Sequence, residues 1–188
     1  LEVALALAGV ALDANRLGYC ALVLVGFHCA LRTMEMLTIT PLQLALTQQA
    51  RGTLALLLTK IGQQRGAQEI VTIDEPLVGF WLYHNAAVTQ ATAPILEGSV
   101  HLFRQFFYHA LDRLEVTQLK FTPYSLRRGG ATHDLNFHQD LQRTIFRGRW
   151  GDLRIARIYL TDGQAALTNM RLSPAAKLQI DKFQRILI

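Results

Sequence analysis

The chain has 188 residues, of which 51% are hydrophobic and 18% are charged. This length suits one domain with a sizeable core, and the composition excludes a disordered chain. Two cysteines cannot form a disulfide framework, and the six histidines show no metal-binding spacing. The longest uncharged apolar stretch, residues 17–31, is too short to cross a membrane, so we expect a buried helix there and no membrane partner.

The net charge of +5 comes mainly from one stretch of the chain. Residues 1–115 carry 7 cations against 9 anions (−2), residues 116–160 carry 8 against 3 (+5), and the remainder carries 4 against 2 (+2). Of the 19 cations, 15 are Arg, whose planar guanidinium binds carboxylate or phosphate through two hydrogen bonds. Two interpretations stay open on charge alone. The basic stretch is either a binding surface for a polyanion or a solvated Arg-rich face without a partner.

The predicted elements begin with helix. Apolar residues recur at three- and four-residue steps from Leu12 to Phe27, and a second helical run covers residues 28–37 before Pro41. Three short runs with alternating or β-branched residues then predict a three-stranded antiparallel sheet. These runs are residues 42–47, 53–59 and 68–73.

Helices are predicted for most of the remaining chain, at residues 77–88, 100–116, 121–135, 138–148 and 151–160. Gly129 and Gly130 stand inside one of them, where each glycine costs about 1 kcal/mol relative to alanine. They allow close approach of either another helix or a DNA backbone. The tail, residues 164–188, has an apolar stripe that either packs on this chain or docks on a neighbour. The predicted fold is a single α+β domain, mainly α, with a small three-stranded antiparallel sheet, over residues 1–188.

Four segments carry residue types that phosphate chemistry uses. In the first, an Arg and a Glu lie three residues apart on one predicted helix face, and in the second a Lys lies in the turn after the second strand. In the third, a Tyr lies three residues before an Arg, and in the fourth a Trp lies nine residues before a Tyr. The candidate catalytic residues are Arg32, Glu35, Lys60, Tyr124, Arg127, Trp150 and Tyr159.

The order and spacing of these segments resemble the catalytic domain of the tyrosine recombinases, the family of the phage integrases. That family has an Arg followed three residues later by an acidic residue, then a Lys on a β-hairpin turn. It also has a His-x-x-Arg box, and a His or Trp nine residues before the nucleophilic Tyr. The likeness covers roughly residues 12–163. Tyr124 departs from the pattern, because the family has His there. A Tyr still donates a hydrogen bond to phosphate, but it does not exchange protons near neutral pH as His does.

The resemblance implies a fold, that of the DNA breaking-rejoining enzymes, and an activity. The activity is that of a site-specific recombinase or integrase of a mobile element. Such an enzyme cleaves and rejoins DNA strands through a 3′-phosphotyrosyl intermediate, without ATP, a metal ion or any other cofactor. In this scheme Tyr159 is the nucleophile, and Arg32 and Arg127 stabilise the charge of the transition state.

The resemblance also implies roles for the remaining candidates. Lys60 protonates the 5′ leaving oxygen, and Trp150 donates its indole N–H to a phosphate oxygen. Tyr124 donates a hydrogen bond to the phosphate, and Glu35 holds the site in register. Further contacts to DNA are expected from Arg128, Arg147, Arg149 and Arg154.

The implied partners are double-stranded DNA and, as in the family, three further copies that complete a tetramer on DNA. Family members carry a separate N-terminal helical domain that closes around DNA. The chain begins with Leu1, so we expect it to be part of a longer protein. The compartment stays open between the bacterial or phage nucleoid and a eukaryotic nucleus. Three alternatives remain: a cleavage-deficient DNA-binding domain of the same fold, a type IB topoisomerase, and a helical interaction protein with an incidental Arg-rich stretch.

Overall fold

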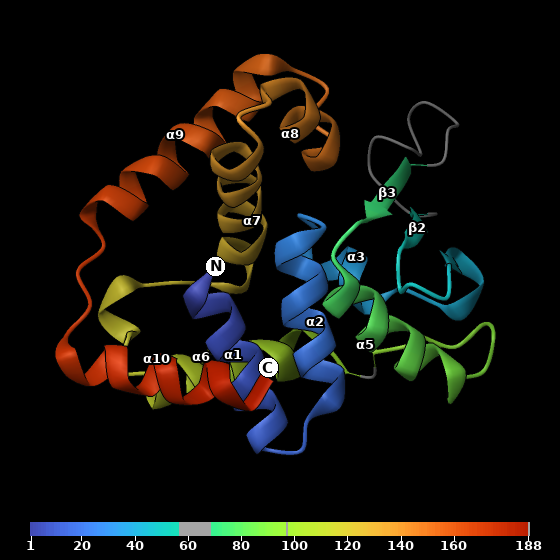
Figure 1. Ribbon diagram of the computed structural model, residues 1–188, viewed down its shortest axis with the longest axis horizontal. Helices are drawn as coiled ribbons and strands as arrows, with labels where there is room; N and C mark the ends of the chain where they lie inside the picture. Colours follow the sequence, from blue (N-terminus) through green and yellow to red (C-terminus); the bar gives the residue numbers. More distant parts are fainter. Residues whose placement is uncertain (57–68, 97, 188) are drawn as a thin grey trace.

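The computed structural model describes residues 1–56, 69–96 and 98–187, and helices make up most of them (Figure 1). The helices are α1 (Glu2–Asp13), α2 (Leu17–His28), α3 (Thr33–Leu37), α5 (Pro76–Ala87), α6 (Val100–Arg113), α7 (Pro123–His138), α8 (Leu141–Gly148), α9 (Leu153–Asn169) and α10 (Pro174–Leu187). Single 3-10 turns cover Pro41–Gln43 and Thr117–Leu119, and the strands are β1 (Leu44–Leu46), β2 (Gly52–Leu56) and β3 (Glu69–Ile73). A mainly helical domain with a small three-stranded antiparallel sheet, as predicted, is confirmed.

Helix α2 forms the centre of the core. Every residue from Cys20 to Phe27 is buried, and a helix that is apolar on all sides needs protein on all sides. The predicted continuous helix through this region is wrong at its start. The chain turns between α1 and α2, where Asn15 has a left-handed backbone with φ of 52°.

The predicted helical run over residues 28–37 is confirmed only for Thr33–Leu37, because the chain breaks at Ala30, whose φ is 48°. Helix α3 begins at Thr33, so Arg32 is its N-cap residue and Glu35 lies in its first turn. The two residues therefore do not share one helix face. Instead the Glu35 carboxylate accepts the backbone N–H of Arg32 at 2.8 Å and satisfies a donor that the short helix leaves free.

The sheet has the order β1-β2-β3, and Leu54 on the central strand faces Leu44 on one side and Val71 on the other. Its burial alternates as the pleat requires: Leu54 and Val71 are buried, whereas Thr53 and Thr72 are exposed. The sheet leads into α5, which has Glu75 as N-cap and begins at Pro76, one residue before the predicted start. The end of the predicted second strand, together with the turn that holds Lys60, lies outside the described residues.

Helix α7 packs directly on α2 through its paired glycines. A Cβ atom on Gly130 would collide with the backbone carbonyl oxygen of Phe27, and one on Gly129 would lie 3.3 Å from the Phe27 ring. Close approach of another helix is therefore what the structure shows for Gly130. This contact carries Arg127, three residues earlier in α7, to the end of α2.

The last two helices take different positions (Figure 1). Helix α9 lies against α7 through Ala156 and Leu160, and α10 packs along α1, where Phe183 is 1% exposed. The apolar stripe of the tail is thus divided. Phe183 and Leu187 are buried on this chain, whereas Leu178 and Ile186 stay exposed. Within the described ranges, no helix has both the length and the hydropathy needed to cross a bilayer.

Candidate active site

Six of the seven predicted catalytic residues come together where α3, α7 and α9 meet the C-terminal end of α2. The six are Arg32, Glu35, Tyr124, Arg127, Trp150 and Tyr159. They lie on three of the four segments that the sequence singled out. Lys60, the seventh, lies outside the described residues.

Arg127 is the buried centre of this site, with 1% of its surface exposed. Its Nη1 and Nη2 atoms each donate to a backbone carbonyl oxygen at 2.5 Å, one of Ala30 and one of Gly148. Its guanidinium carbon lies 5.6 Å from the centre of the Trp150 ring. Burial, and after it the positive charges of Arg149 and Arg32, lowers the pKa of Arg127 to about 10. Arg127 is therefore a fixed cation at neutral pH.

Glu35 joins two guanidinium groups on one carboxylate. Its Oε1 accepts Nη1 of Arg32 at 2.6 Å, and its Oε2 accepts Nη2 of Arg149 at 2.6 Å. The side chain of Arg32 is 36% exposed, whereas that of Arg149 is only 5% exposed. Arg32 thus remains accessible to a ligand while it is held by a buried partner.

Three aromatic side chains form the other half of the site. The Tyr159 ring stacks on Trp150 with centroids 5.5 Å apart and planes 14° apart, and the Tyr124 ring lies 5.9 Å from it. Burial and then the neighbouring hydroxyl of Tyr159 raise the pKa of Tyr124, against the opposing effect of Arg127 and Arg32. Tyr124 is therefore a protonated phenol at neutral pH.

The site has an excess of hydrogen-bond donors and of positive charge. The buried Nε of Arg127 and Nε1 of Trp150 have no hydrogen-bond acceptor among the described residues, and the Nε of Arg149 forms only an ion pair with Glu69 at 3.4 Å. Each buried donor in that condition costs roughly 1–3 kcal/mol. Three guanidinium groups face two carboxylates, those of Glu35 and Glu69, which leaves +1. The arrangement suits an anion rich in oxygen acceptors, and phosphate is such an anion.

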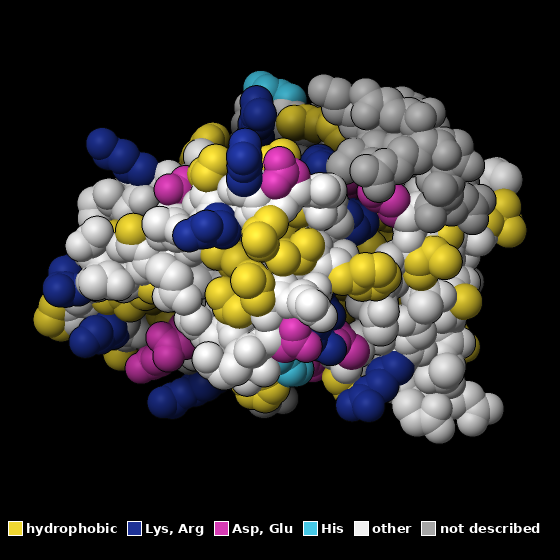
Figure 2. All heavy atoms as spheres, turned by 90° about the horizontal axis from the view of Figure 1, so that it is seen from above, with side chains coloured by type: hydrophobic (Ala, Val, Ile, Leu, Met, Phe, Trp, Pro, Cys, Tyr) yellow, Lys and Arg dark blue, Asp and Glu magenta, His cyan; other side chains and the backbone are white. Residues whose placement is uncertain are grey.

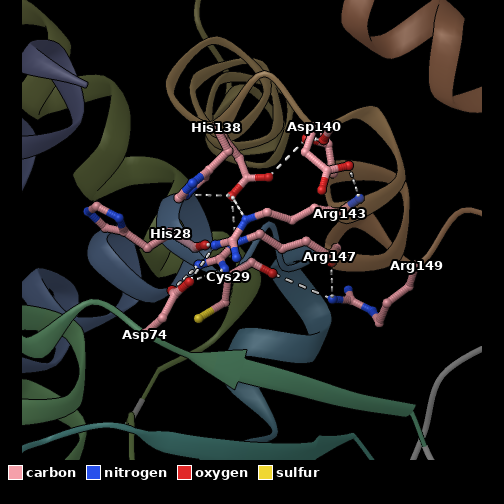
Figure 3. Close-up of polar contacts among 10 residues, drawn as sticks. His28, Cys29, Asp74, His138, Asp140, Arg143, Arg147 and Arg149 are labelled. Carbon is pink, nitrogen blue, oxygen red and sulfur yellow. Dashed lines mark hydrogen bonds and ion pairs between the residues drawn. The ribbon is translucent and has the colours of Figure 1, made fainter.

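A second ion-pair network lies beside the site and holds α8 to the start of α5 (Figure 3). Arg147 donates to both carboxylate oxygens of Asp74, at 2.9 and 2.7 Å, and to the carbonyl oxygen of His28 at 2.7 Å. Arg143 bonds the same Asp74 at 2.6 Å and Asp134 at 3.3 Å. Burial raises the pKa of Asp74, but the hydrogen bonds and charges of Arg147 and Arg143 outweigh it and lower that pKa to about 2.

The four predicted DNA contacts therefore fall into two groups. Arg147 is mostly buried and paired with Asp74, and Arg149 is buried and paired with Glu35. Arg154 is exposed at the start of α9. Arg128 is half-buried and lines a cavity of about 530 Å³ between α1, α7 and α9. On the face where α8 and α9 lie, Lys and Arg side chains stand singly around a central hydrophobic group (Figure 2).

Sequence reasoning missed the acidic partners that hold the Arg side chains. Asp74 carried a signal, since it precedes Glu75 and Pro76, but that pattern predicts only a helix start. Asp134 and Glu69 carried none, because their partners become neighbours only in the folded chain. Within the described part of the chain, no group of three or more His, Cys, Asp or Glu side chains is arranged to hold a metal ion. Comparison with family models, with curated proteins and with solved structures found no match to this chain.

Proposed function

We propose that this chain is the catalytic domain of a tyrosine-type DNA recombinase or integrase with the DNA breaking-rejoining fold. One observation carries the proposal. Six residues selected only by their order and spacing, over positions 32 to 159, meet around one buried guanidinium. Residues with unrelated roles in the core or on the surface would not be expected to lie close together. A shared site accounts for the proximity of these six.

The proposed reaction exchanges one phosphodiester for another. The hydroxyl oxygen of Tyr159 attacks a DNA phosphorus, the bond from phosphorus to the 5′ oxygen breaks, and the 5′ hydroxyl leaves with a proton. The product is a 3′-phosphotyrosyl link, and attack by the 5′ hydroxyl of another strand restores the free Tyr. The number of phosphoester bonds is unchanged, so no energy source is required. Lys60 remains the predicted donor of the leaving group's proton.

The described residues support the charge stabilisation that this reaction needs. In the transition state, negative charge grows on the non-bridging phosphate oxygens, and preorganised donors lower its energy. Arg127 uses two of its five N–H groups on backbone carbonyls, and Arg32 uses one on Glu35. The remaining N–H groups, with the indole N–H of Trp150, are donors of the required kind.

The Tyr124–Tyr159 pair supports Tyr159 as the nucleophile. A phenol becomes reactive when its proton is removed and its oxygen is held in place. The neighbouring Tyr124 is expected to donate a hydrogen bond to that oxygen and to stabilise the negative charge that forms on it. In this proposal the substrate is double-stranded DNA, with Arg128 and Arg154 as further contacts, and the active assembly on DNA is a tetramer. The domain belongs to a longer protein of a mobile element.

Covalent capture tests the function. The protein is mixed with a library of duplexes of randomised sequence, each carrying a nick that lets the 5′ fragment diffuse away. Wild type is expected to give a protein–DNA adduct on a denaturing gel, and Tyr159→Phe is expected to give none. Tyr108→Phe, which removes an exposed hydroxyl on α6, is the matched control and should keep the adduct.

Other results favour the alternatives. An adduct that persists in Tyr159→Phe contradicts the assignment of the nucleophile. Salt-dependent DNA binding by the wild type without any adduct favours a cleavage-deficient DNA-binding domain. Relaxation of supercoiled DNA without strand exchange between duplexes favours a topoisomerase.

A further inference from the structure

Arg149 has an unusual position for a residue of the basic stretch. It follows α8 with a left-handed backbone, φ 52°, a conformation that residues other than glycine seldom adopt. Its guanidinium is buried, with 5% of the side chain exposed. It comes immediately before Trp150, so the turn that places the Trp150 ring beside Tyr159 also sends Arg149 into the protein.

The contacts of Arg149 lead to Arg32 through a shared carboxylate. Arg149 donates to Oε2 of Glu35 at 2.6 Å, while Arg32 bonds Oε1 of the same group at 2.6 Å and Oε2 through its backbone N–H at 2.8 Å. The Nη2 atom of Arg149 also lies 3.5 Å from the carbonyl oxygen of Ala30, which accepts Arg127 as well. On its other side, Nε lies 3.4 Å from a carboxylate oxygen of Glu69.

Charge balance shows what this arrangement does for Arg32. If Glu35 faced Arg32 alone, the two charges would cancel, and Arg32 would offer an anion little attraction. A second guanidinium on the opposite carboxylate oxygen takes up part of the carboxylate's charge, although Glu69, 3.4 Å from Arg149, neutralises some of what Arg149 adds. Because Arg149 is buried, it interacts with the carboxylate in a medium that screens charge less than water does.

We propose that Arg149 is a positioning residue: it fixes the Glu35 carboxylate and offsets part of its charge, so that Arg32 keeps positive charge for the phosphate. The identity of that phosphate as a DNA phosphodiester rests on the function proposed above. Arg149 itself does not touch the substrate in this scheme. It acts through Glu35, and this separates its role from the direct DNA contact that its place in the basic stretch predicts.

Inorganic phosphate is the probe, because its binding is measured without any cleavage. Isothermal titration at low salt compares the full chain with Arg149→Met, Arg149→Lys, Glu35→Gln, and the double variant Glu35→Gln/Arg149→Met. Arg143→Met is the matched control, since it removes an Arg of the same stretch that is paired with other acids. Thermal unfolding shows which variants fold.

Arg149→Met is expected to weaken phosphate binding on the order of tenfold, the effect of one charge near a partly exposed site. Arg149→Lys is expected to keep most of the affinity. The double variant is expected to recover to within roughly threefold of wild type, because it removes the uncompensated carboxylate together with the cation. Arg143→Met is expected to bind phosphate as wild type does.

Several results overturn the proposal. These are wild-type affinity in Arg149→Met, a double variant that binds as weakly as Arg149→Met, and a wild type that does not bind phosphate. If Arg149→Met does not fold, the double variant decides alone, since both charges of the pair are absent from it. The adduct assay keeps the two proposals apart. If phosphate binding changes as expected but no adduct forms, strand transfer is refuted and the role of Arg149 stands. If an adduct forms but Arg149→Met binds phosphate as wild type does, strand transfer stands and the role of Arg149 is refuted.

Discussion

At the scale of single residues, Arg127 belongs to the fold and to the site at once. Two of its N–H groups bind the carbonyl oxygens of Ala30 and Gly148 and so join the end of α2 to the end of α8. Its positive charge stays next to the stacked pair of Trp150 and Tyr159. The resemblance to the tyrosine recombinases, which rests on residue order and spacing, predicted Arg127 as a catalytic residue. That it is almost fully buried follows only from the packing of α7 on α2.

Tyr124 leads to a prediction about pH dependence. Its raised pKa keeps the phenol protonated through the neutral range, so this position adds no titration there. In Tyr124→His, a neutral imidazole would take the proton of Tyr159. The rate of adduct formation should then rise with pH through a step near pH 6.5, and should exceed wild type by about tenfold above it. Single-turnover adduct formation from pH 5 to pH 9 measures this.

Tyr124→Phe is the control for that experiment. It keeps the ring and removes the hydroxyl, so adduct formation should slow by about tenfold with no new step, as expected for one lost hydrogen bond. Should the His variant show the same flat pH profile as the Phe variant, the hydrogen bond to Tyr159 would not be part of the reaction.

At the scale of elements, the C-terminal end of α2 organises the site. The carbonyl oxygens of the three residues that follow one another there accept Arg side chains from distant segments. The pairs are His28 with Arg147, Cys29 with Arg149, and Ala30 with Arg127. A helix C-terminus carries partial negative charge and favours cations. Helix α2, which the sequence predicted only as part of the core, is therefore followed by three carbonyl oxygens that bind three guanidinium groups.

The glycine pair of α7 gives a prediction about stability. A Cβ on Gly130 would collide with the Phe27 backbone, which cannot yield without moving α2. Gly130→Ala should therefore lower the free energy of unfolding by roughly 1–3 kcal/mol, net of the helix propensity that alanine gains. Urea denaturation measures it.

Gly129→Ala provides the matched comparison one residue earlier. Its Cβ would meet only an edge atom of the Phe27 ring at 3.3 Å, and alanine is the better helix former by about 1 kcal/mol. The two effects should nearly cancel. Equal destabilisation by both substitutions would mean that α7 does not rest on α2 through Gly130.

At the scale of the whole molecule, folding redistributes the charge that the sequence separates. Residues 1–115 are net negative and residues 116–160 net positive, and the structure pairs acids of the first part with Arg side chains of the second. The acids are Glu35, Glu69 and Asp74, and the cations are Arg143, Arg147 and Arg149. Part of the charge of the basic stretch therefore lies in internal ion pairs.

These pairings predict how stability depends on pH. Burial, and after it the charge of Arg147, lowers the pKa of His28 to about 4, below the ordinary value near 6.5. Between these values the unfolded chain binds a proton that the folded chain does not. The free energy of unfolding should therefore fall as pH drops from about 6.5 to about 4. The pKa of Asp74 is lowered to about 2, so the free energy of unfolding should fall further as pH drops below about 3.8.

His28→Gln isolates the first of these effects. The variant removes the titrating group, so its stability should change less between pH 6.5 and pH 4 than that of wild type. Urea denaturation at four or five pH values measures the slope. His101→Gln, an exposed position on α6, is the control and should keep the wild-type profile. An unaltered slope in His28→Gln would contradict a neutral His28 in the folded state.

Local patterns were enough for part of this description. The period of apolar residues determined the class of fold, the sheet and most helix positions, because those signals depend on neighbours within a few residues. Spacing determined six candidate residues that the structure then brings together. The breaks at Asn15 and Ala30 escaped prediction, since a left-handed backbone at Asn or Ala has no reliable local signature.

Only the tertiary structure decided which Arg side chains are free. Arg149 and Arg147 look like Arg154 in the sequence, yet two are buried against carboxylates and one is exposed. Their partners lie 73 to 114 residues away along the chain, so no local pattern reveals the pairing. The pairing cannot be predicted locally, because a carboxylate accepts any guanidinium that the packing of the elements brings to it. Local sequence determines the elements, and their packing determines which charges cancel and which remain for a ligand.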